Sequence, residues 1–204
     1  MIIIPKISEE NRQSKIEFIT NTALKLFSKK GFSLTTMDDI VSACKMSKGG
    51  IYNYFKSKEE IFLAIAEERF NKRHELITTF PNDITCTEKL IRYLRWILEG
   101  LFHEETSMNA RFTFEFWSVM SRNNAIPEIV SRRYKLFYND LADILKEGLS
   151  EGEFQSDIDI DAMVYIILST TDGIGYSNSV MGLPITKAVV ENYIDMILKK
   201  IIKN

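Results

Sequence analysis

Cysteine and histidine are scarce in this sequence, and their scarcity argues against two kinds of site. The 204 residues include two cysteines, Cys44 and Cys86, and two histidines, His74 and His103. Two cysteines are too few for a disulfide framework or a cysteine-ligated zinc site, and neither histidine has a partner at metal-ligand spacing. We therefore expect no metal and no cofactor, and we expect both cysteines to be buried in the core.

Long apolar runs are absent as well. No segment reaches the roughly 18 consecutive apolar residues that a membrane-spanning helix needs. The opening MIIIPK lacks the basic start and long apolar stretch of a secretory signal. We expect a cytoplasmic protein with no membrane partner. Hydrophobic residues form 45% and charged residues 26% of the chain, which allows a globular fold with a sizeable core.

The groupings that carry catalysis are also missing. No nucleophile, base and orienting group occur at a recognisable spacing, so we expect no enzyme. The segment DIDID at residues 157–161 begins like a calcium loop, but Ala162 and Leu168 stand where such a loop needs glycine and glutamate. The segment DGIG at residues 172–175 lacks the preceding strand and the third glycine of a dinucleotide-binding turn. Its small residues are expected to permit close packing of helices.

Charge is divided unevenly along the chain. Residues 1–60 contain 10 Lys and Arg against 7 Asp and Glu, whereas residues 61–204 contain 16 against 21. A basic N-terminal part on an acidic remainder suggests that the N-terminal part meets an anionic surface.

Helical periodicity is present along the whole chain. Apolar residues recur at helical spacing from Ile16 to Phe27, and this first helix stops at a Lys-Lys-Gly stretch. Later helices are expected near residues 87–104, 109–122, 127–150, 160–181 and 187–202. The sequence predicts an all-α protein of about nine helices. A three-helix N-terminal domain (residues 1–60) precedes a larger helical domain (residues 61–204).

Two short helices joined by a three-residue turn are predicted within residues 36–55. Thr36 is placed to cap the first helix and Ser47 to cap the second. Met46 and Ile51 occupy the two positions of a hydrophobic staple around Ser47, which sets the angle of the second helix. This arrangement is a helix-turn-helix, whose second helix enters the major groove of DNA.

The second helix carries residue types that suit DNA contact. Gly49 and Gly50 in its first turn would let backbone N–H groups approach a phosphate at the positive end of the helix dipole. Asn53 can pair with adenine, while tyrosine hydroxyls and lysine ammonium groups can reach phosphates. The candidate DNA contacts are Thr36, Ser47, Lys48, Gly49, Gly50, Tyr52, Asn53, Tyr54, Lys56 and Lys58.

The stretch TTMDDIVSACKMSKGGIYNYFKSKEEIF resembles the DNA-binding signature of the TetR family of bacterial transcriptional regulators. The matching residues are Gly31-Phe32, Thr35-Thr36, Ile40, Ala43, Ser47, Lys48, Gly49, Tyr52, Tyr54-Phe55, Lys58 and Glu59. Two positions depart from the family pattern. Lys45 stands where the family usually has glycine in the turn, and Gly50 stands where it usually has a threonine that contacts DNA.

The resemblance also implies a small-molecule effector site in the larger domain. Ten of the 23 aromatic residues lie between residues 93 and 138. They either fill the core or line a ligand cavity between helices, and the resemblance supports the cavity. Glu115 is either a solvated carboxylate or a partner for a cationic ligand beside aromatic faces. The candidate residues are Trp96, Phe112, Glu115, Phe116, Trp117, Met120, Tyr134, Phe137, Tyr138 and Tyr165.

The last two predicted helices each carry a wide apolar stripe. One stripe contains Met163, Ile166, Ile167, Thr170 and Ile174, and the other contains Tyr193, Ile194, Ile197 and Ile201. Each stripe is wider than a neighbour within the chain is expected to cover, so we predict a homodimer with a four-helix interface about a two-fold axis. Such a dimer presents two DNA-binding helices related by the two-fold axis, so its operator should be near-palindromic.

The sequence therefore predicts a ligand-responsive, DNA-binding transcriptional regulator. We expect a repressor that a small molecule releases from its palindromic operator, with double-stranded DNA, the unidentified effector and a second copy as partners. The alternative is a helical small-molecule binding module that does not act through DNA. The capped turn flanked by lysines favours the regulator, because a carrier has no use for it.

Overall fold

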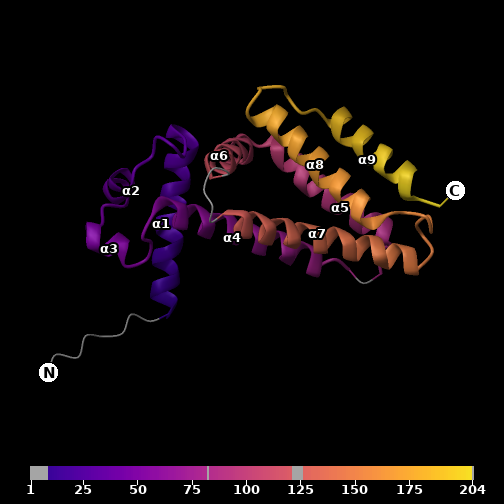
Figure 1. The fold of residues 1–204 in the computed structure, drawn as a ribbon, viewed down its shortest axis with the longest axis horizontal. Helices are drawn as coiled ribbons and strands as arrows, with labels where there is room; N and C mark the ends of the chain where they lie inside the picture. The colour runs from indigo at the N-terminus through magenta and orange to yellow at the C-terminus, as the bar shows by residue number, and fades with distance from the viewer. Residues whose placement is uncertain (1–8, 82, 121–125, 204) are drawn as a thin grey trace. The chain divides into compact units, whose positions relative to one another are not determined.

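The structure is a computed structural model that describes residues 9–81, 83–120 and 126–203. Its elements are α1 (Glu9–Lys30), α2 (Met37–Cys44), α3 (Lys48–Tyr52), α4 (Lys58–Thr78), α5 (Cys86–Glu99), a 3₁₀ turn η1 (Gly100–Phe102), α6 (Glu104–Met120), α7 (Ile126–Ser150), α8 (Ile160–Ser179) and α9 (Lys187–Ile201) (Figure 1). The prediction of an all-α fold is confirmed. None of the helices described is long and apolar enough to cross a membrane.

The chain forms two compact units, Met1–Asn71 and Lys72–Asn204, which we call the head and the body. The division lies inside α4, whereas the sequence placed it near residue 60. The reason is that the first turns of α4 belong to the head core. Phe62 on α4 packs edge-on against Phe32, with ring centroids 5.8 Å apart.

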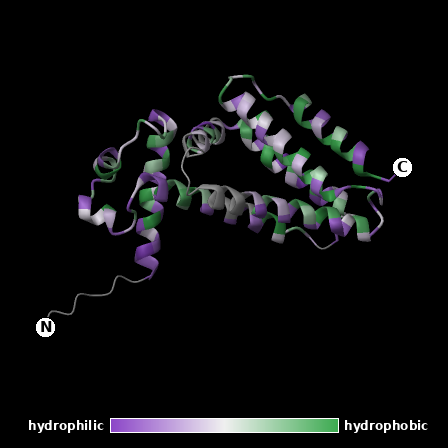
Figure 2. Cartoon of the chain, viewed as in Figure 1, coloured by the Kyte–Doolittle hydropathy of each residue, from purple (hydrophilic) through white to green (hydrophobic). Residues whose placement is uncertain are grey.

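The head core is built from the inward faces of α1 to α4. Figure 2 shows hydrophobic and hydrophilic residues interspersed along these helices, as helical periodicity requires. The buried side chains include Ile19, Ala23, Phe27, Ile40, Cys44, Ile51, Phe55, Ile61 and Phe62. The two short helices α2 and α3 therefore rest on α1 and α4, since neither is long enough to be stable alone.

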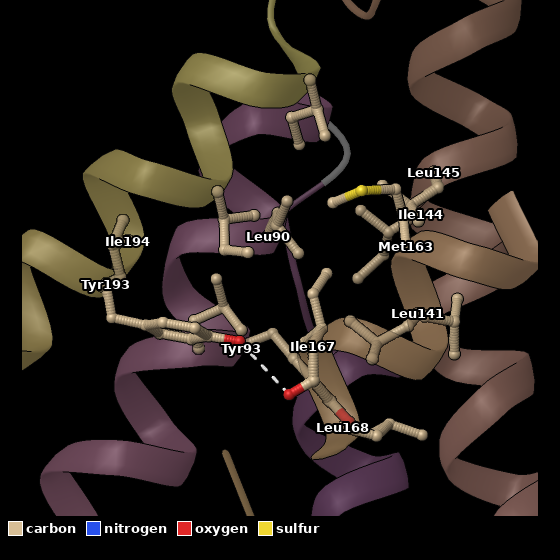
Figure 3. Close-up of a cluster of buried hydrophobic side chains, with 14 of the residues drawn as sticks. Leu90, Tyr93, Leu141, Ile144, Leu145, Met163, Ile167, Leu168, Tyr193 and Ile194 are labelled. Atoms are coloured by element: carbon tan, nitrogen blue, oxygen red, sulfur yellow. Dashed lines mark hydrogen bonds between the residues drawn. The ribbon is translucent and has the colours of Figure 1, made fainter. Parts of the chain in front are cut away.

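The body core lies among α5, α7, α8 and α9 (Figure 3). Leu90 and Tyr93 come from α5, and the α7 side chains Leu141 and Leu145 are completely buried. The hydroxyl of Tyr193 on α9 donates a hydrogen bond to the carbonyl of Ile167 on α8, at 3.2 Å. This bond satisfies a buried polar atom between two neighbouring helices.

This core corrects the predicted dimer stripe. Six of the nine predicted interface residues are buried within their own chain, namely Met163, Ile167, Tyr193, Ile194, Ile197 and Ile201. The physical reason is that α8 packs on α7, and α9 packs on α5, so their strongest apolar stripes face the interior. Ile166 is instead 46% exposed, and Thr170 and Ile174 are partly buried.

The start of α5 is held by a carboxylate from the α7–α8 connection. Glu153 accepts hydrogen bonds from the backbone N–H groups of Cys86 and Thr87, at 2.9 and 3.0 Å, and from the Thr87 hydroxyl. Burial opposes the charged form of Glu153, but these hydrogen bonds outweigh it and lower its pKa. Burial and nearby carboxylates raise the pKa of the Cys86 thiol to about 12. Cys86 is thus an unreactive core thiol at neutral pH.

Candidate nucleic-acid interface

The helix-turn-helix begins at a reciprocal cap on α2. The Thr36 hydroxyl accepts a hydrogen bond from the backbone N–H of Asp39, at 3.1 Å. The Asp39 carboxylate in turn accepts hydrogen bonds from the Thr36 N–H at 2.8 Å and from the Lys30 ammonium at 2.7 Å. The hydrogen bond from Lys30, followed by those from Thr36, holds the pKa of Asp39 well below its usual range. The predicted capping role of Thr36 is confirmed.

Lys45 starts the turn between α2 and α3 in a left-handed conformation. Its φ is 53°, and it is the one non-glycine residue with positive φ among the residues described. A side chain in this conformation costs up to about 1 kcal/mol relative to glycine. The turn accepts lysine in this conformation because α2 and α3 are anchored on both sides of it by buried side chains.

The second helix, α3, is capped as predicted but ends earlier than expected. The Ser47 hydroxyl accepts a hydrogen bond from the Gly50 N–H at 3.1 Å. The helix closes at Tyr52, and the chain then turns through Asn53 to the buried Phe55. A side-chain cap at Ser47 and the buried Ile51 and Phe55 thus hold a helix of only five residues.

The two glycines of α3 differ in their surroundings. A Cβ atom added at Gly49 would meet nothing within 4 Å. One added at Gly50 would lie 3.1 Å from the Ser47 hydroxyl oxygen. Packing within the chain therefore explains a small residue at position 50 but not at position 49. Gly49 leaves open backbone at the N-terminal, electropositive end of the helix, where an external anion would be favoured.

Lys48 is exposed beside an acidic residue that the sequence predictions overlooked. Its ammonium lies 2.9 Å from the Asp38 carboxylate and 5.9 Å from the centre of the Tyr52 ring. The hydrogen bond with Asp38 raises the pKa of Lys48. Because both side chains are largely exposed, a phosphate can compete with Asp38 for this ammonium. The signal in the sequence was an acidic residue in the first turn of α2.

The remaining candidates divide into outward and inward groups. Thr36, Ser47, Lys48, Gly49, Asn53 and Lys56 are exposed, while Gly50, Tyr52 and Tyr54 are half-buried. Lys56 donates a hydrogen bond from its ammonium to the Tyr52 carbonyl and stays on the surface. Lys58 is different, since its ammonium binds backbone carbonyls in the α1–α2 loop. The structure does not group Lys58 with the predicted DNA contacts.

The predicted effector residues fall into three settings in the body. Phe116 is buried, with its ring 5.0 Å from that of Trp117. Trp96, Tyr134 and Tyr165 are exposed, whereas Glu115, Trp117, Phe137 and Tyr138 are partly buried. The side chains of Phe112 and Met120 lie outside the described residues. The group on α6 therefore remains the candidate effector region.

A groove of about 420 Å³ lies elsewhere in the body, along α8 and its connection to α9. Its lining residues are Thr170, Gly173, Ile174, Ser177, Leu183, Pro184, Ile185 and Val189. Asn178 positions the connection, because its side-chain oxygen accepts a hydrogen bond from the Ile185 N–H at 3.1 Å. The small residues of 172–175 were expected to permit close helix packing. An added Cβ would meet nothing within 4 Å at Gly173, but at Gly175 it would lie 3.7 Å from the Phe114 ring. Leu183, Pro184 and Ile185 went unpredicted, because the connection has no helical periodicity.

The sequence matches two families that together cover both units. Residues 19–65 match the family described as bacterial regulatory proteins, tetR family. Residues 89–189 match the tetracyclin repressor-like C-terminal domain.

Relatives match over most of their length. YfiR, an uncharacterized HTH-type transcriptional regulator of Bacillus subtilis, is 30% identical over 170 residues, covering 83% of this chain and 82% of its own. KstR2, an HTH-type transcriptional repressor of Mycolicibacterium smegmatis, is 24% identical over 164 residues, covering 78% and 76%. The solved structure of Salmonella enterica GusR superposes with a TM-score of 0.76 at 21% identity, covering 96% of this chain and 98% of that one. At that identity the likeness shows the fold.

Proposed function

Because the chain belongs to the tetR family of bacterial regulatory proteins, we propose that it represses transcription from an operator bound by its head. The family predicted from the signature is confirmed. The chain is a ligand-responsive, DNA-binding transcriptional regulator, and its family consists of regulators rather than enzymes. The finer proposals below concern which residues bind DNA, how two copies associate and where the effector acts.

The observation that carries the proposed DNA contact is the open N-terminal end of α3. Gly49 leaves its backbone accessible, and the Lys48 ammonium lies on the exposed side of the same turn. A phosphate there would accept hydrogen bonds from backbone N–H groups. The helix dipole and the Lys48 ammonium would both stabilise its negative charge. Asn53 and Lys56 are exposed after the C-terminal end of α3 and would meet base edges and a second phosphate.

We place the dimer interface on the outward faces of α8 and α9 and on the connection between them. The exposed apolar side chains there are Ile166, Val180, Met181, Leu183, Val189 and Met196. Leu183 and Val189 also line the groove, and exposed apolar surface of this kind is typical of an interface. A second copy related by a two-fold axis would cover both grooves at once and present two heads to a near-palindromic operator.

The effector is proposed to act from the body, beside the partly buried Glu115 and Trp117 of α6. Binding there would favour a head spacing that no longer matches the operator. A coupling of about 1–3 kcal/mol between effector and DNA sites gives a useful response.

A mobility-shift experiment with the DNA immediately upstream of the protein's own gene tests the function. We expect a shifted complex that resists unrelated competitor DNA and weakens steeply as salt rises, because phosphate contacts release counterions. The absence of selective binding at low salt would contradict the repressor proposal.

Gly49→Ala is expected to raise the stability of the head while lowering its affinity for DNA. The open space around Gly49 accepts a methyl group, and alanine favours a helix over glycine by about 0.5–1 kcal/mol. The head should therefore unfold at a higher temperature. Affinity for the upstream DNA should fall roughly tenfold or more, since the methyl group would occupy the space of the phosphate. Paired thermal melts and mobility shifts measure both effects, and an unchanged affinity would contradict the proposed phosphate position.

A further inference from the structure

The ammonium of Lys58, the first residue of α4, makes all three of its hydrogen bonds inside the head. Its ammonium donates to the carbonyls of Phe32 at 2.8 Å, Ser33 at 3.1 Å and Thr35 at 2.9 Å. An ammonium group has three N–H donors, so three carbonyls account for all of them. No donor is left to bind a phosphate.

The ammonium also rests on an aromatic ring. It lies 4.5 Å from the centre of the Phe32 ring, a distance at which a cation and a ring attract one another. Phe32 is itself buried, with Phe27 at 5.2 Å and Phe62 at 5.8 Å between ring centres. The cation is thus held between the aromatic core of the head and the backbone of the loop.

The three carbonyls belong to the loop between α1 and α2. Such oxygens repel one another when they point to a common position, and a cation there removes the repulsion. The loop is further bound by the Thr35 hydroxyl, which donates to the Gly31 carbonyl at 2.7 Å, and Thr35 is completely buried. Lys58 therefore ties the start of α4 to a loop that lies 23 to 26 residues earlier in the chain.

The next residue after this loop is Thr36, the cap from which α2 begins. A shift of the loop would move that cap, then α2, and through the three-residue turn the reading helix α3. Sequence-specific recognition requires donors and acceptors to meet base edges within a few tenths of an ångström. The position of α3 on DNA therefore depends on the loop that Lys58 holds.

We propose that Lys58 is a positioning residue for DNA recognition, which fixes the α1–α2 loop and so the placement of Thr36 and α3. It acts through the backbone and does not contact DNA. This inference rests on the proposed function, because it assigns a role within operator binding. It also reverses the sequence prediction, in which Lys58 was one of the DNA contacts.

Arginine and methionine at position 58 distinguish positioning from phosphate contact. Lys58→Arg keeps the charge, but a planar guanidinium cannot direct three N–H groups at three converging carbonyls. If Lys58 bound a phosphate, arginine would serve at least as well. We expect Lys58→Arg and Lys58→Met each to weaken binding to the upstream DNA tenfold or more. The dependence of affinity on salt should keep the wild-type slope, because the same side chains still neutralise the phosphates.

Two other lysines calibrate this measurement. Lys56→Met should lower the salt slope by about 0.9 for each phosphate that position 56 no longer neutralises. Lys25 is exposed on α1 and belongs to none of the proposed contacts, so Lys25→Met should bind the upstream DNA like the wild type. Wild-type affinity for Lys58→Arg, together with a lowered slope for Lys58→Met, would overturn the inference. Failure of the wild-type chain to bind the upstream DNA would instead overturn the proposed function.

A measurement on the unmutated protein covers the case in which position-58 variants do not fold. Lysine ammonium groups held by three hydrogen bonds exchange their protons with water slowly. In a ¹⁵N-lysine-labelled full chain, we expect the Lys58 ammonium signal to be protected and to stay in place when the upstream DNA is added. The Lys56 signal should shift. A Lys58 signal that exchanges rapidly, or that shifts with DNA as much as the Lys56 signal, would overturn the inference.

Discussion

Glutamate in place of Ile197 is expected to unfold the body, whereas glutamate in place of its neighbour Met196 should leave a folded monomer. Ile197 is 2% exposed in the α9 core stripe, and Met196 is 55% exposed on the outward face. An unpaired carboxylate at position 197 would lose its hydration, and the isoleucine packing would disappear as well. Together these effects cost several kcal/mol, about the stability of a typical domain.

Met196→Glu tests the proposed dimer face without disturbing the core. Two carboxylates brought together about a two-fold axis would oppose association, so light scattering should report a monomer with wild-type helix content. Operator affinity should fall sharply, because one head makes half of the contacts. Met196→Gln is the matched control and should weaken the dimer less. An intact dimer for Met196→Glu would contradict the proposed interface, and a folded Ile197→Glu body would contradict the assignment of Ile197 to the core.

Reversing the charge of Lys48 is expected to have the largest effect on DNA binding. Lys48→Glu removes a phosphate contact in each head and places a carboxylate against the DNA. We expect affinity for the upstream DNA to fall roughly a hundredfold or more at low salt. The unfolding temperature should change little, since the Lys48–Asp38 pair is largely exposed.

Asp38→Asn is the matched change in the opposite direction. It keeps the shape of the side chain but removes the carboxylate that competes with phosphate for Lys48. Binding to the upstream DNA should tighten severalfold at the same salt concentration, as titrations of mobility shift will show. Weaker binding by Asp38→Asn would indicate that Asp38 orients Lys48 rather than competing for it.

Much of the fold was predictable, because helices and caps depend on residues close together in the sequence. Thr36 and Ser47 were identified as caps from the residues within three positions of each. Lys45 was identified as a departure in the turn from its place where the family usually has glycine, and the structure gives it a left-handed conformation. These predictions needed no knowledge of what lay across the core.

The direction of a side chain was harder to predict. Lys56 and Lys58 have the same chemistry and lie two positions apart, yet one is exposed and the other binds backbone carbonyls of the α1–α2 loop. Ile197 and Met196 both suit an apolar stripe, but only one faces the core. Periodicity shows that a helix has an apolar face. Because α8 and α9 each carry apolar residues on two faces, periodicity alone does not tell which face is buried.

The sequence by itself determined the helical fold, the helix-turn-helix with its caps and the family, because each follows from local spacing and residue type. Only the tertiary structure decided that Lys56 is exposed while Lys58 binds a loop, and which apolar residues of α8 and α9 remain exposed. Those choices depend on contacts between distant segments, as in the bond from Lys58 to the Phe32 carbonyl 26 residues earlier. Local spacing carries no record of such contacts.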